Sequence, residues 1–236
     1  MTQSTDSMLP RVLVGSALLA LLSACGGGGG DPGTSGPAPA PVCVAAAPPA
    51  PPGPGVAAPQ VTFNLNNGNG VNGNIVITLE PTRAPVTTAN FLAYVNAGFY
   101  NCTVIHRHAP GFVLQGGGYA APLVAGAAAP TLKATQAPIV LEDGAGLSNL
   151  RLTLAMARLP APDTASSQFF INLANNTGLD RTATARGYAV FGTITGGAGV
   201  VDAMAAAPCS AWAGFLGNGE CLPSPNITIM SAAQTR

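Results

Sequence analysis

Apolar and polar residues alternate along several short segments of the chain beyond residue 60. Such a period of two is typical of strands with one buried face. Segment 61–65 alternates in this way, an Asn- and Gly-rich stretch follows at 66–73, and 74–79 alternates again, which together predict a hairpin. The same pattern predicts further short strands at 103–106, 112–115, 139–141, 152–157, 169–173, 189–194 and 226–230.

Two segments place apolar residues at helical spacing instead. Residues 86–95 are preceded by prolines, contain threonines suited to capping, and end before Gly98, which predicts a helix. A second helix is predicted at 199–206. Many short strands separated by turn residues, together with two helices, predict a mainly β fold: a closed barrel with helical lids.

The first 24 residues follow a different pattern. Arg11 precedes an apolar run at 12–22, which is shorter than the roughly 20 residues that span a bilayer. The run ends in Leu-Ser-Ala followed by Cys25, which resembles the signal of bacterial lipoproteins. Residues 1–24 are therefore predicted to be a signal peptide that is removed, and Cys25 to be acylated. A plain signal peptide cut near Ala24 is the alternative.

Residues 25–59 consist largely of Gly, Pro and Ala. Glycine gives a flexible hinge and proline an extended spacer, and such a segment buries too little surface to fold alone. We expect a tether that holds a globular domain, residues 60–236, away from a membrane. The expected location is a bacterial cell envelope, facing the periplasm. Gly26, in place of an Asp that retains lipoproteins at the inner membrane, favours the outer membrane.

The composition narrows the expected partners and cofactors. Only 8% of residues are charged, the nine basic and nine acidic residues balance, and Lys133 is the single lysine. A nucleic-acid partner is not expected, because binding phosphates requires clustered basic residues. Cys102, His106 and His108 do not have the spacing of a zinc site, so no metal is expected.

Four cysteines follow Cys25, and exported proteins commonly pair them. Cys209 and Cys221 flank a short Gly-rich loop and are expected to form one disulfide. Cys43 and Cys102 would then form a second disulfide that fixes the tether to the domain. Four free thiols are the alternative.

The most informative segment is 105–119, where Arg107 lies in an apolar run before Gln115 and three glycines. On a strand, this arrangement would place one fixed cation beside a small apolar pocket, with glycines that allow a sharp bend. The alternative is a half-buried strand whose Arg extends to solvent.

Residues 60–231 resemble a cyclophilin-type peptidyl-prolyl cis-trans isomerase in its bacterial form. The resemblance rests on ordered blocks at 90–94 with 98–100, 105–107 with 110–112 and 115–117, 147–149, 155–158, 167–172, 179–180 and 188–192. It implies an eight-stranded antiparallel barrel, closed by a helix at each end, with a substrate groove on its outer wall.

The resemblance also implies the chemistry. The enzyme would rotate the peptide bond before proline in exported proteins, assisting their folding without a cofactor. Arg107 would donate a hydrogen bond to the imide nitrogen, and apolar residues would hold the proline ring. The implied substrate-binding residues are His106, Phe112, Val113, Gln115, Ala157, Arg158, Gln168, Phe170, Leu179 and Tyr188.

Some positions depart from the family pattern. Val113 stands where Met is usual, and Gly178 stands where eukaryotic members carry a Trp that contacts cyclosporin. We therefore expect weak cyclosporin binding. The Ala-rich loop at 120–138 carries no motif, so its contacts are not predicted. A monomer is expected, and the alternative function is a holdase that grips proline-containing segments with little catalysis.

Overall fold

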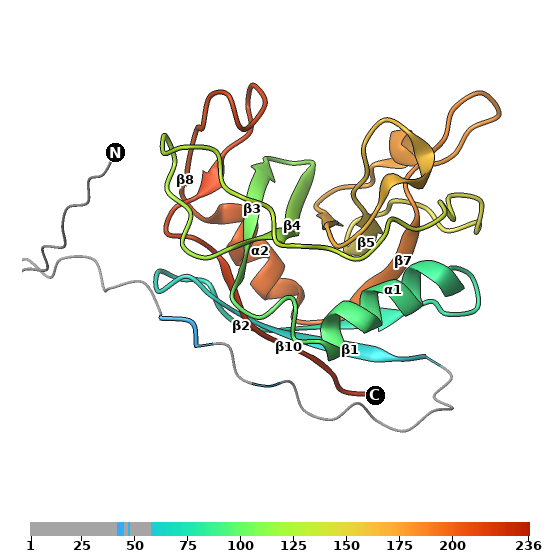
Figure 1. The fold of residues 1–236 in the computed structure, drawn as a ribbon, viewed down its shortest axis with the longest axis horizontal. Helices are drawn as coiled ribbons and strands as arrows, with labels where there is room; N and C mark the ends of the chain where they lie inside the picture. Colours follow the sequence, from blue (N-terminus) through green and yellow to red (C-terminus); the bar gives the residue numbers. More distant parts are fainter. Residues whose placement is uncertain (1–41, 45–46, 48–57) are drawn as a thin grey trace, which may run out of the picture. The chain divides into compact units, whose positions relative to one another are not determined.

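Eight antiparallel strands close into a barrel in this computed structural model (Figure 1). Their order around the barrel is β1-β10-β3-β4-β6-β5-β7-β2. The structure describes residues 42–44, 47 and 58–236. The predicted signal peptide, Cys25 and most of the predicted tether lie outside these residues.

The elements are short, as the repeated turn signals predict. The barrel strands are β1 (Gln60–Asn66), β2 (Asn72–Leu79), β3 (Thr103–Ala109), β4 (Val113–Ala120), β5 (Thr153–Met156), β6 (Phe169–Asn172), β7 (Val190–Gly196) and β10 (Thr228–Gln234). The other elements are α1 (Pro85–Asn96), α2 (Ala198–Ala206), the 3-10 turns η1 (Pro162–Thr164) and η2 (Thr177–Leu179), and the paired strands β8 (Cys209–Ser210) and β9 (Leu222–Pro223). The expected barrel with two helices is confirmed.

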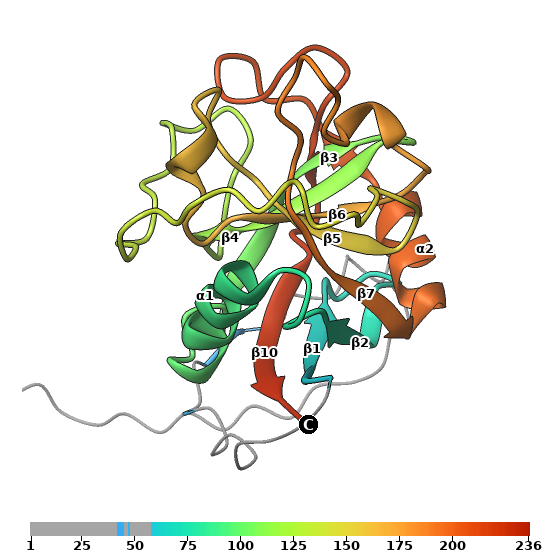
Figure 2. The same cartoon turned by 90° about the vertical axis from the view of Figure 1, so that its right-hand side faces the viewer.

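The barrel core forms because alternate strand residues point inward. Phe63 of β1 and Phe169 of β6 are fully buried there, with ring centroids 5.6 Å apart. Phe91 of α1 packs 6.0 Å from Phe63, so this helix covers one opening of the barrel. Val201 and Met204 of α2 are also fully buried. Figure 2 shows α1 and α2 on opposite sides of the strands.

One predicted strand is wrong. Segment 139–141 forms only an isolated bridge, in which Ile139 pairs with Ala165. The Leu141 amide donates instead to the Asp163 carboxylate, at 2.9 Å. The segment is extended, but its backbone groups bond to a loop and not to a neighbouring strand, so no ladder forms.

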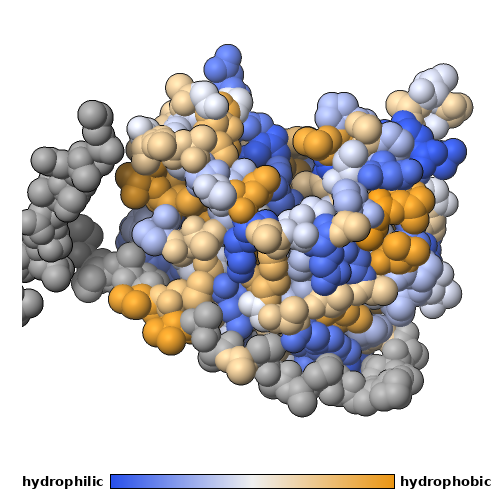
Figure 3. Space-filling view, viewed as in Figure 1, coloured by the Kyte–Doolittle hydropathy of each residue, from blue (hydrophilic) through white to orange (hydrophobic). Residues whose placement is uncertain are grey.

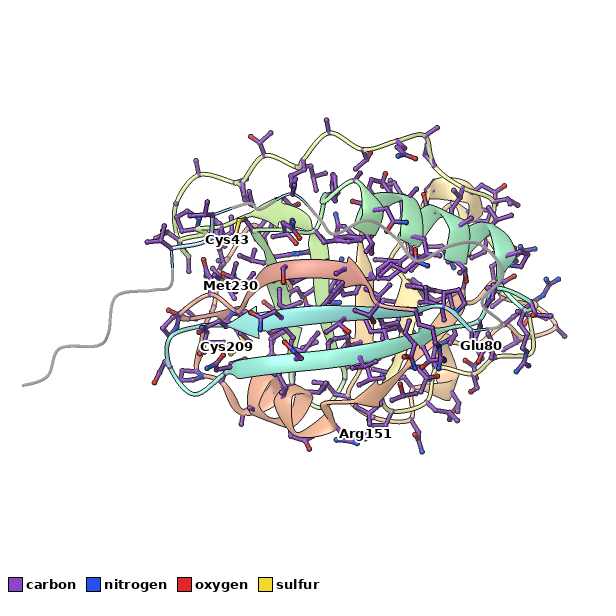
Figure 4. All side chains as sticks on the ribbon, turned by 90° about the horizontal axis from the view of Figure 1, so that it is seen from below. Cys43, Glu80, Arg151, Cys209 and Met230 are labelled. Atoms are coloured by element: carbon purple, nitrogen blue, oxygen red, sulfur yellow. A yellow bond between two sulfur atoms is a disulfide. The ribbon has the colours of Figure 1, made fainter. Side chains whose placement is uncertain are left out.

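Both suggested disulfides are present. Cys43 is bonded to Cys102 with Cα atoms 5.5 Å apart, and Cys209 to Cys221 with Cα atoms 5.4 Å apart. The Cys43 sulfur lies 3.8 Å from the carbonyl oxygen of Met230 on β10 (Figure 4). The first bond thus attaches the segment around Cys43 to the barrel, and the second closes the loop between β8 and β9.

The visible surface mixes residue types. In Figure 3, hydrophobic and hydrophilic residues are interspersed over this face and do not form separate fields. Within residues 42–44, 47 and 58–236, none of the helices has both the length and the apolar character needed to cross a membrane.

Candidate active site

One row of cross-strand partners runs across five strands of the barrel wall. Arg107 of β3 pairs with Gln115 of β4, which pairs with Phe170 of β6. Phe170 pairs with Ala155 of β5, which pairs with Val190 of β7. Directly opposed residues point to the same face of a sheet. Since their strand neighbours, including Leu114, Phe169 and Leu154, belong to the barrel core, this row faces outward.

A cavity of about 130 Å³ lies over this row. Its lining brings together most of the residues predicted from sequence to bind substrate. They are Arg107, Phe112, Val113, Gln115, Ala157, Arg158, Phe170, Leu179 and Tyr188. The remaining two, His106 and Gln168, do not line the cavity.

One side of the cavity, here called the apolar wall, consists of Phe112, Val113, Phe170, Leu179 and Tyr188. Val113 and Phe170 are 2% and 4% exposed and pack with Ala109, Ala155 and Val190 in a small hydrophobic cluster separate from the barrel core. Tyr188 lies edge-on to Phe170, with ring centroids 5.5 Å apart. Only Phe112 is substantially exposed, at 36%. This wall is a preformed apolar surface.

Arg107 and Gln115 line another side of the cavity. Together with Gln168 and Glu220, which hydrogen-bond to them from outside the lining, they are here called the polar wall. Arg107 donates from Nη1 to Gln115 Oε1 at 3.0 Å, and Gln115 donates from Nε2 to Gln168 Oε1 at 2.8 Å. From Nη2, Arg107 donates to the Glu220 carboxylate. The Arg107 and Glu220 side chains are 23% and 21% exposed. The guanidinium is thus held from two sides.

Gln168 has space to join this wall because Gly118 has no side chain. A Cβ at Gly118 would lie 2.8 Å from the Gln168 amide nitrogen. The third glycine of the sequence motif is therefore explained by this close approach. The strand itself is irregular here, since the pairing of β3 with β4 shifts between Ile105 and Arg107.

Glu220 was not predicted from the sequence. It belongs to the loop that the disulfide of Cys209 and Cys221 closes. The hydrogen bond from Arg107 lowers the pKa of Glu220 below its usual value. The carboxylate is therefore charged at neutral pH and forms an ion pair with Arg107.

His106 lies behind the polar wall and not in the cavity. It is 4% exposed, and its ring lies edge-on to Tyr119 with centroids 4.7 Å apart. Burial, with a smaller effect of the Arg107 charge, lowers its pKa to about 4. The structure thus places a neutral, buried imidazole where sequence comparison implied a groove residue.

Comparison with known proteins agrees with this fold. The family model for cyclophilin type peptidyl-prolyl cis-trans isomerases matches residues 61–233. The chain belongs to this cyclophilin family. A peptidyl-prolyl cis-trans isomerase of Acinetobacter baylyi is 44% identical over 159 residues, which cover 67% of this chain and 79% of the relative. Peptidyl-prolyl cis-trans isomerase A of Dickeya dadantii is 42% identical over 160 residues, 68% of this chain and 78% of the relative.

A solved cyclophilin has the same fold. The crystal structure of a Cryptosporidium parvum cyclophilin type isomerase superposes with a TM-score of 0.58 at 22% identity. The match covers 76% of this chain and 98% of the other.

In this cyclophilin, Arg158 fixes the rim of the cavity through its side chain. Its guanidinium lies 4.6 Å from the centre of the Tyr188 ring and donates to the carbonyl oxygens of Leu159 and Gly187, at 2.9 and 3.0 Å. The neighbouring Ala157 amide donates to the Gln168 carbonyl at 3.0 Å. These bonds hold Tyr188 and the strand edge in place.

A polar network supports the apolar wall, and sequence reasoning did not assign it a role. The Asn149 amide and side chain donate to Asp180 Oδ1 at 2.7 and 2.8 Å, and the Ser148 hydroxyl also donates to this carboxylate. Burial tends to raise the pKa of Asp180, but these hydrogen bonds outweigh it and lower the pKa. These hydrogen bonds fix Asp180, the residue that follows Leu179. The signal for it was present in the sequence, because the blocks 147–149 and 179–180 both belong to the family pattern.

The same network reaches Phe112. Buried Asn172 donates to Asn149 Oδ1 at 3.2 Å and accepts from Asn176 at 2.8 Å. Asn176 also donates to the Phe112 carbonyl, at 2.9 Å. The backbone on both sides of the apolar wall is therefore connected to one set of linked side-chain amides.

One group of metal-ligand residue types lies outside the cavity lining. His108, Cys209 and Cys221 place ligand atoms within 4.8 Å of one another. The two sulfurs are joined in a disulfide, so neither is a thiolate that would bind a metal ion.

Proposed function

We propose that the cavity beside Arg107 is the site where this cyclophilin rotates X-Pro peptide bonds of exported proteins. The observation that carries the proposal is that the fixed guanidinium of Arg107 and the preformed apolar wall lie together in one cavity. Arg107 and the apolar wall line the same cavity, on adjoining sides of one cross-strand row.

The reaction requires binding energy and no covalent chemistry. The peptide bond has a rotation barrier of about 18–20 kcal/mol, because conjugation gives it partial double-bond character. Twisting the bond removes this conjugation and returns a lone pair to the imide nitrogen. An enzyme accelerates rotation if it binds the twisted state more tightly than either planar state.

Arg107 supplies the interaction that only the twisted state makes. A guanidinium has five N–H donors and stays charged at any working pH. Gln115 and Glu220 each accept from a different terminal nitrogen of Arg107, which leaves donors for the substrate. One of them hydrogen-bonds the imide nitrogen as its lone pair appears. Gln115 both orients Arg107 and bonds the substrate backbone.

The apolar wall holds the proline ring while the preceding carbonyl group rotates. Phe112, Val113, Phe170 and Leu179 provide contacts that do not change during rotation. Because these contacts are similar in the planar and twisted states, they set affinity more than rate.

The proposed substrates lie outside the cytoplasm. Two observations support this: the lipoprotein-like sequence that ends at Cys25, and the two disulfides of the described residues. Disulfides persist in oxidising compartments such as the bacterial periplasm. An acylated Cys25 would tether the enzyme to the envelope, with the outer membrane favoured by Gly26.

The test is a protease-coupled proline isomerisation assay on the full chain. Arg107→Ala should remove most of the rate. The matched control is Arg151→Ala, since Arg151 pairs with exposed Asp202 of α2 and neither residue lines the cavity. Unchanged turnover in Arg107→Ala would contradict the proposal. Peptide binding without measurable turnover in the unmodified chain would instead support the holdase.

A further inference from the structure

A backbone bridge explains why Glu220 reaches Arg107. The His108 amide donates to the Cys221 carbonyl at 2.8 Å, and the Cys221 amide donates back to the His108 carbonyl at 2.9 Å. Residues next to such a pair point to the opposite face from the pair itself. Glu220 therefore shares the outer face of β3 with Arg107 and Ala109, and a long side chain reaches its diagonal neighbour.

The loop that carries Glu220 is anchored at several points. Besides the disulfide, Trp212 is 5% exposed and its ring lies 4.6 Å from Phe215. Phe215 lies edge-on to Tyr119 of β4, with centroids 5.4 Å apart. The Gly217 amide donates to Glu220 Oε2 at 3.0 Å, so the loop fixes one carboxylate oxygen while Arg107 binds the other.

The hydrogen bond from the Gly217 amide to Glu220 depends on residue 217 having no side chain. A Cβ at Gly217 would lie 3.1 Å from Glu220 Oε2, which is a tight contact. The carboxylate is thus held by its own loop before any substrate binds. A flexible Arg side chain loses rotamer entropy when it is fixed, and fixing it in advance removes part of that cost from the reaction.

We propose that Glu220 is a positioning residue for Arg107, which acts in proline isomerisation by holding the guanidinium toward the cavity. The inference rests on the function proposed above for Arg107. The second acceptor, Gln115, holds Nη1 from β4, while Glu220 holds Nη2 from the disulfide-closed loop. The two acceptors come from separate parts of the chain, and together they fix the plane of the guanidinium.

A purely structural role predicts a different result. Partly exposed ion pairs contribute little to stability. If Glu220 acts by positioning, removing it changes turnover much more than it changes the unfolding temperature. Substrate affinity should be spared, because Glu220 does not line the cavity in which the apolar wall binds the proline ring.

The experiment compares Glu220→Gln and Glu220→Ala in the full chain, with kcat and KM measured separately. The Gln variant keeps an acceptor for Arg107 but loses the charge, so kcat should fall in the order Glu, Gln, Ala. For Glu220→Ala we expect a loss of about tenfold in kcat, as for one charge-assisted hydrogen bond, with KM within about twofold. Asp202→Asn is the control, because it removes the acid of the exposed pair with Arg151.

Measuring the Glu220 change in the Arg107→Ala variant separates an effect on the orientation of Arg107 from an effect on folding. In Arg107→Ala, adding Glu220→Ala should not lower turnover further, since no guanidinium remains to be held. A further loss in that background, or an equal loss in Asp202→Asn, would overturn the inference. Unchanged or raised kcat in both Glu220 variants would also overturn it, while leaving the role of Arg107 intact if Arg107→Ala is inactive. If Arg107→Ala keeps full activity, the proposed function itself fails.

Discussion

The two walls of the cavity are held by different kinds of contact. The apolar wall packs on a hydrophobic cluster that includes buried Val113 and Phe170, and its backbone is fixed by the linked side-chain amides of Asn172 and Asn176. The polar wall depends on side-chain hydrogen bonds between partly exposed groups, from Gln168 through Gln115 and Arg107 to Glu220. One wall is set by packing and the other by the orientation of a few donors and acceptors.

This difference assigns the walls different parts of the reaction. Contacts that are equal in the planar and twisted states lower KM, whereas contacts made only in the twisted state raise kcat. The apolar wall supplies the first kind and Arg107 the second. Changes to the polar wall should therefore lower kcat, and changes to the apolar wall should raise KM.

The largest effect is expected from Arg107→Lys, which keeps the charge but removes the planar fork. A lysine has one nitrogen and does not hold Gln115 and Glu220 while donating to the substrate. We expect kcat to fall by roughly 30- to 100-fold, about 2–3 kcal/mol, with KM nearly unchanged. Steady-state kinetics on a proline peptide measures both. A raised KM with normal kcat would show that Arg107 only binds the ground state.

A second prediction concerns His106, which supports the polar wall from behind. Its pKa is lowered from 6.5 to about 4, so the unfolded chain binds a proton more readily than the folded one. The stability that comes from neutral, buried His106 is fully present above pH 6.5 and is lost as the pH falls toward 4. Between pH 7 and 5 the loss is roughly 2 kcal/mol.

Urea unfolding at pH 7 and pH 5 measures this loss. His108 also has a lowered pKa and adds a loss of the same sign, so the comparison needs His106→Gln. The variant should lose less stability on acidification than the unmodified chain. Asp180 and Glu220, whose pKa values lie below the usual carboxyl values, do not titrate in this interval. An equal pH dependence in the two chains would refute the prediction.

The apolar wall is tested by Phe112→Ala. Phe112 is already 36% exposed, so its truncation should affect folding little. Loss of part of the proline contact should raise KM by about five- to tenfold, about 1–1.4 kcal/mol, and leave kcat within about twofold. Val86→Ala on α1 is the control, because Val86 is 40% exposed and does not line the cavity. If kcat alone fell, Phe112 would act on the twisted state and not mainly on affinity, which would contradict the role given to the apolar wall.

The smallest effect concerns the outer edge of the apolar wall. Gly178 precedes Leu179, and a Cβ built there meets no atom within 4 Å. Gly178→Trp should therefore fold and extend the wall with an aromatic ring. We predict weak cyclosporin binding for the natural chain and expect the variant to bind it about fivefold more tightly, about 1 kcal/mol. Cyclosporin titration followed by tryptophan fluorescence measures the affinity of each chain. Equal affinity in both chains would show that residue 178 does not contribute to cyclosporin binding.

The barrel was predictable from the sequence because its signals are local and repeated. Alternation and turn residues predict the β1–β2 hairpin, whose register runs from Gln60 opposite Thr78 to Asn66 opposite Asn72. Segment 139–141 has the same local pattern, but no neighbouring strand is available to it. Periodicity reports which residues are buried and not which backbone groups find partners.

The site was predictable where it depends on the ordered family blocks. Those blocks contain Arg107, Gln115 and Phe170, which cross-strand pairing places in one row. Glu220 was missed because its contact with Arg107 depends on the backbone bridge between His108 and Cys221, two residues that are far apart in the sequence. The available signal was an acid beside a cysteine expected to be paired, in a chain with only nine acids. The burial of His106 was not predictable, because the family blocks give its position in the chain but not its surroundings.

The most direct test of the account is exchange NMR on a proline peptide bound at saturation to the full chain and to Arg107→Ala. At saturation, the measured cis–trans exchange rate belongs to the bound peptide and is separate from affinity. The account predicts that the variant binds the peptide with a Kd within about threefold of the unmodified chain, while bound-state exchange slows by at least about 100-fold. Undiminished exchange in the bound variant, with only the affinity lost, would contradict the division of roles between the two walls.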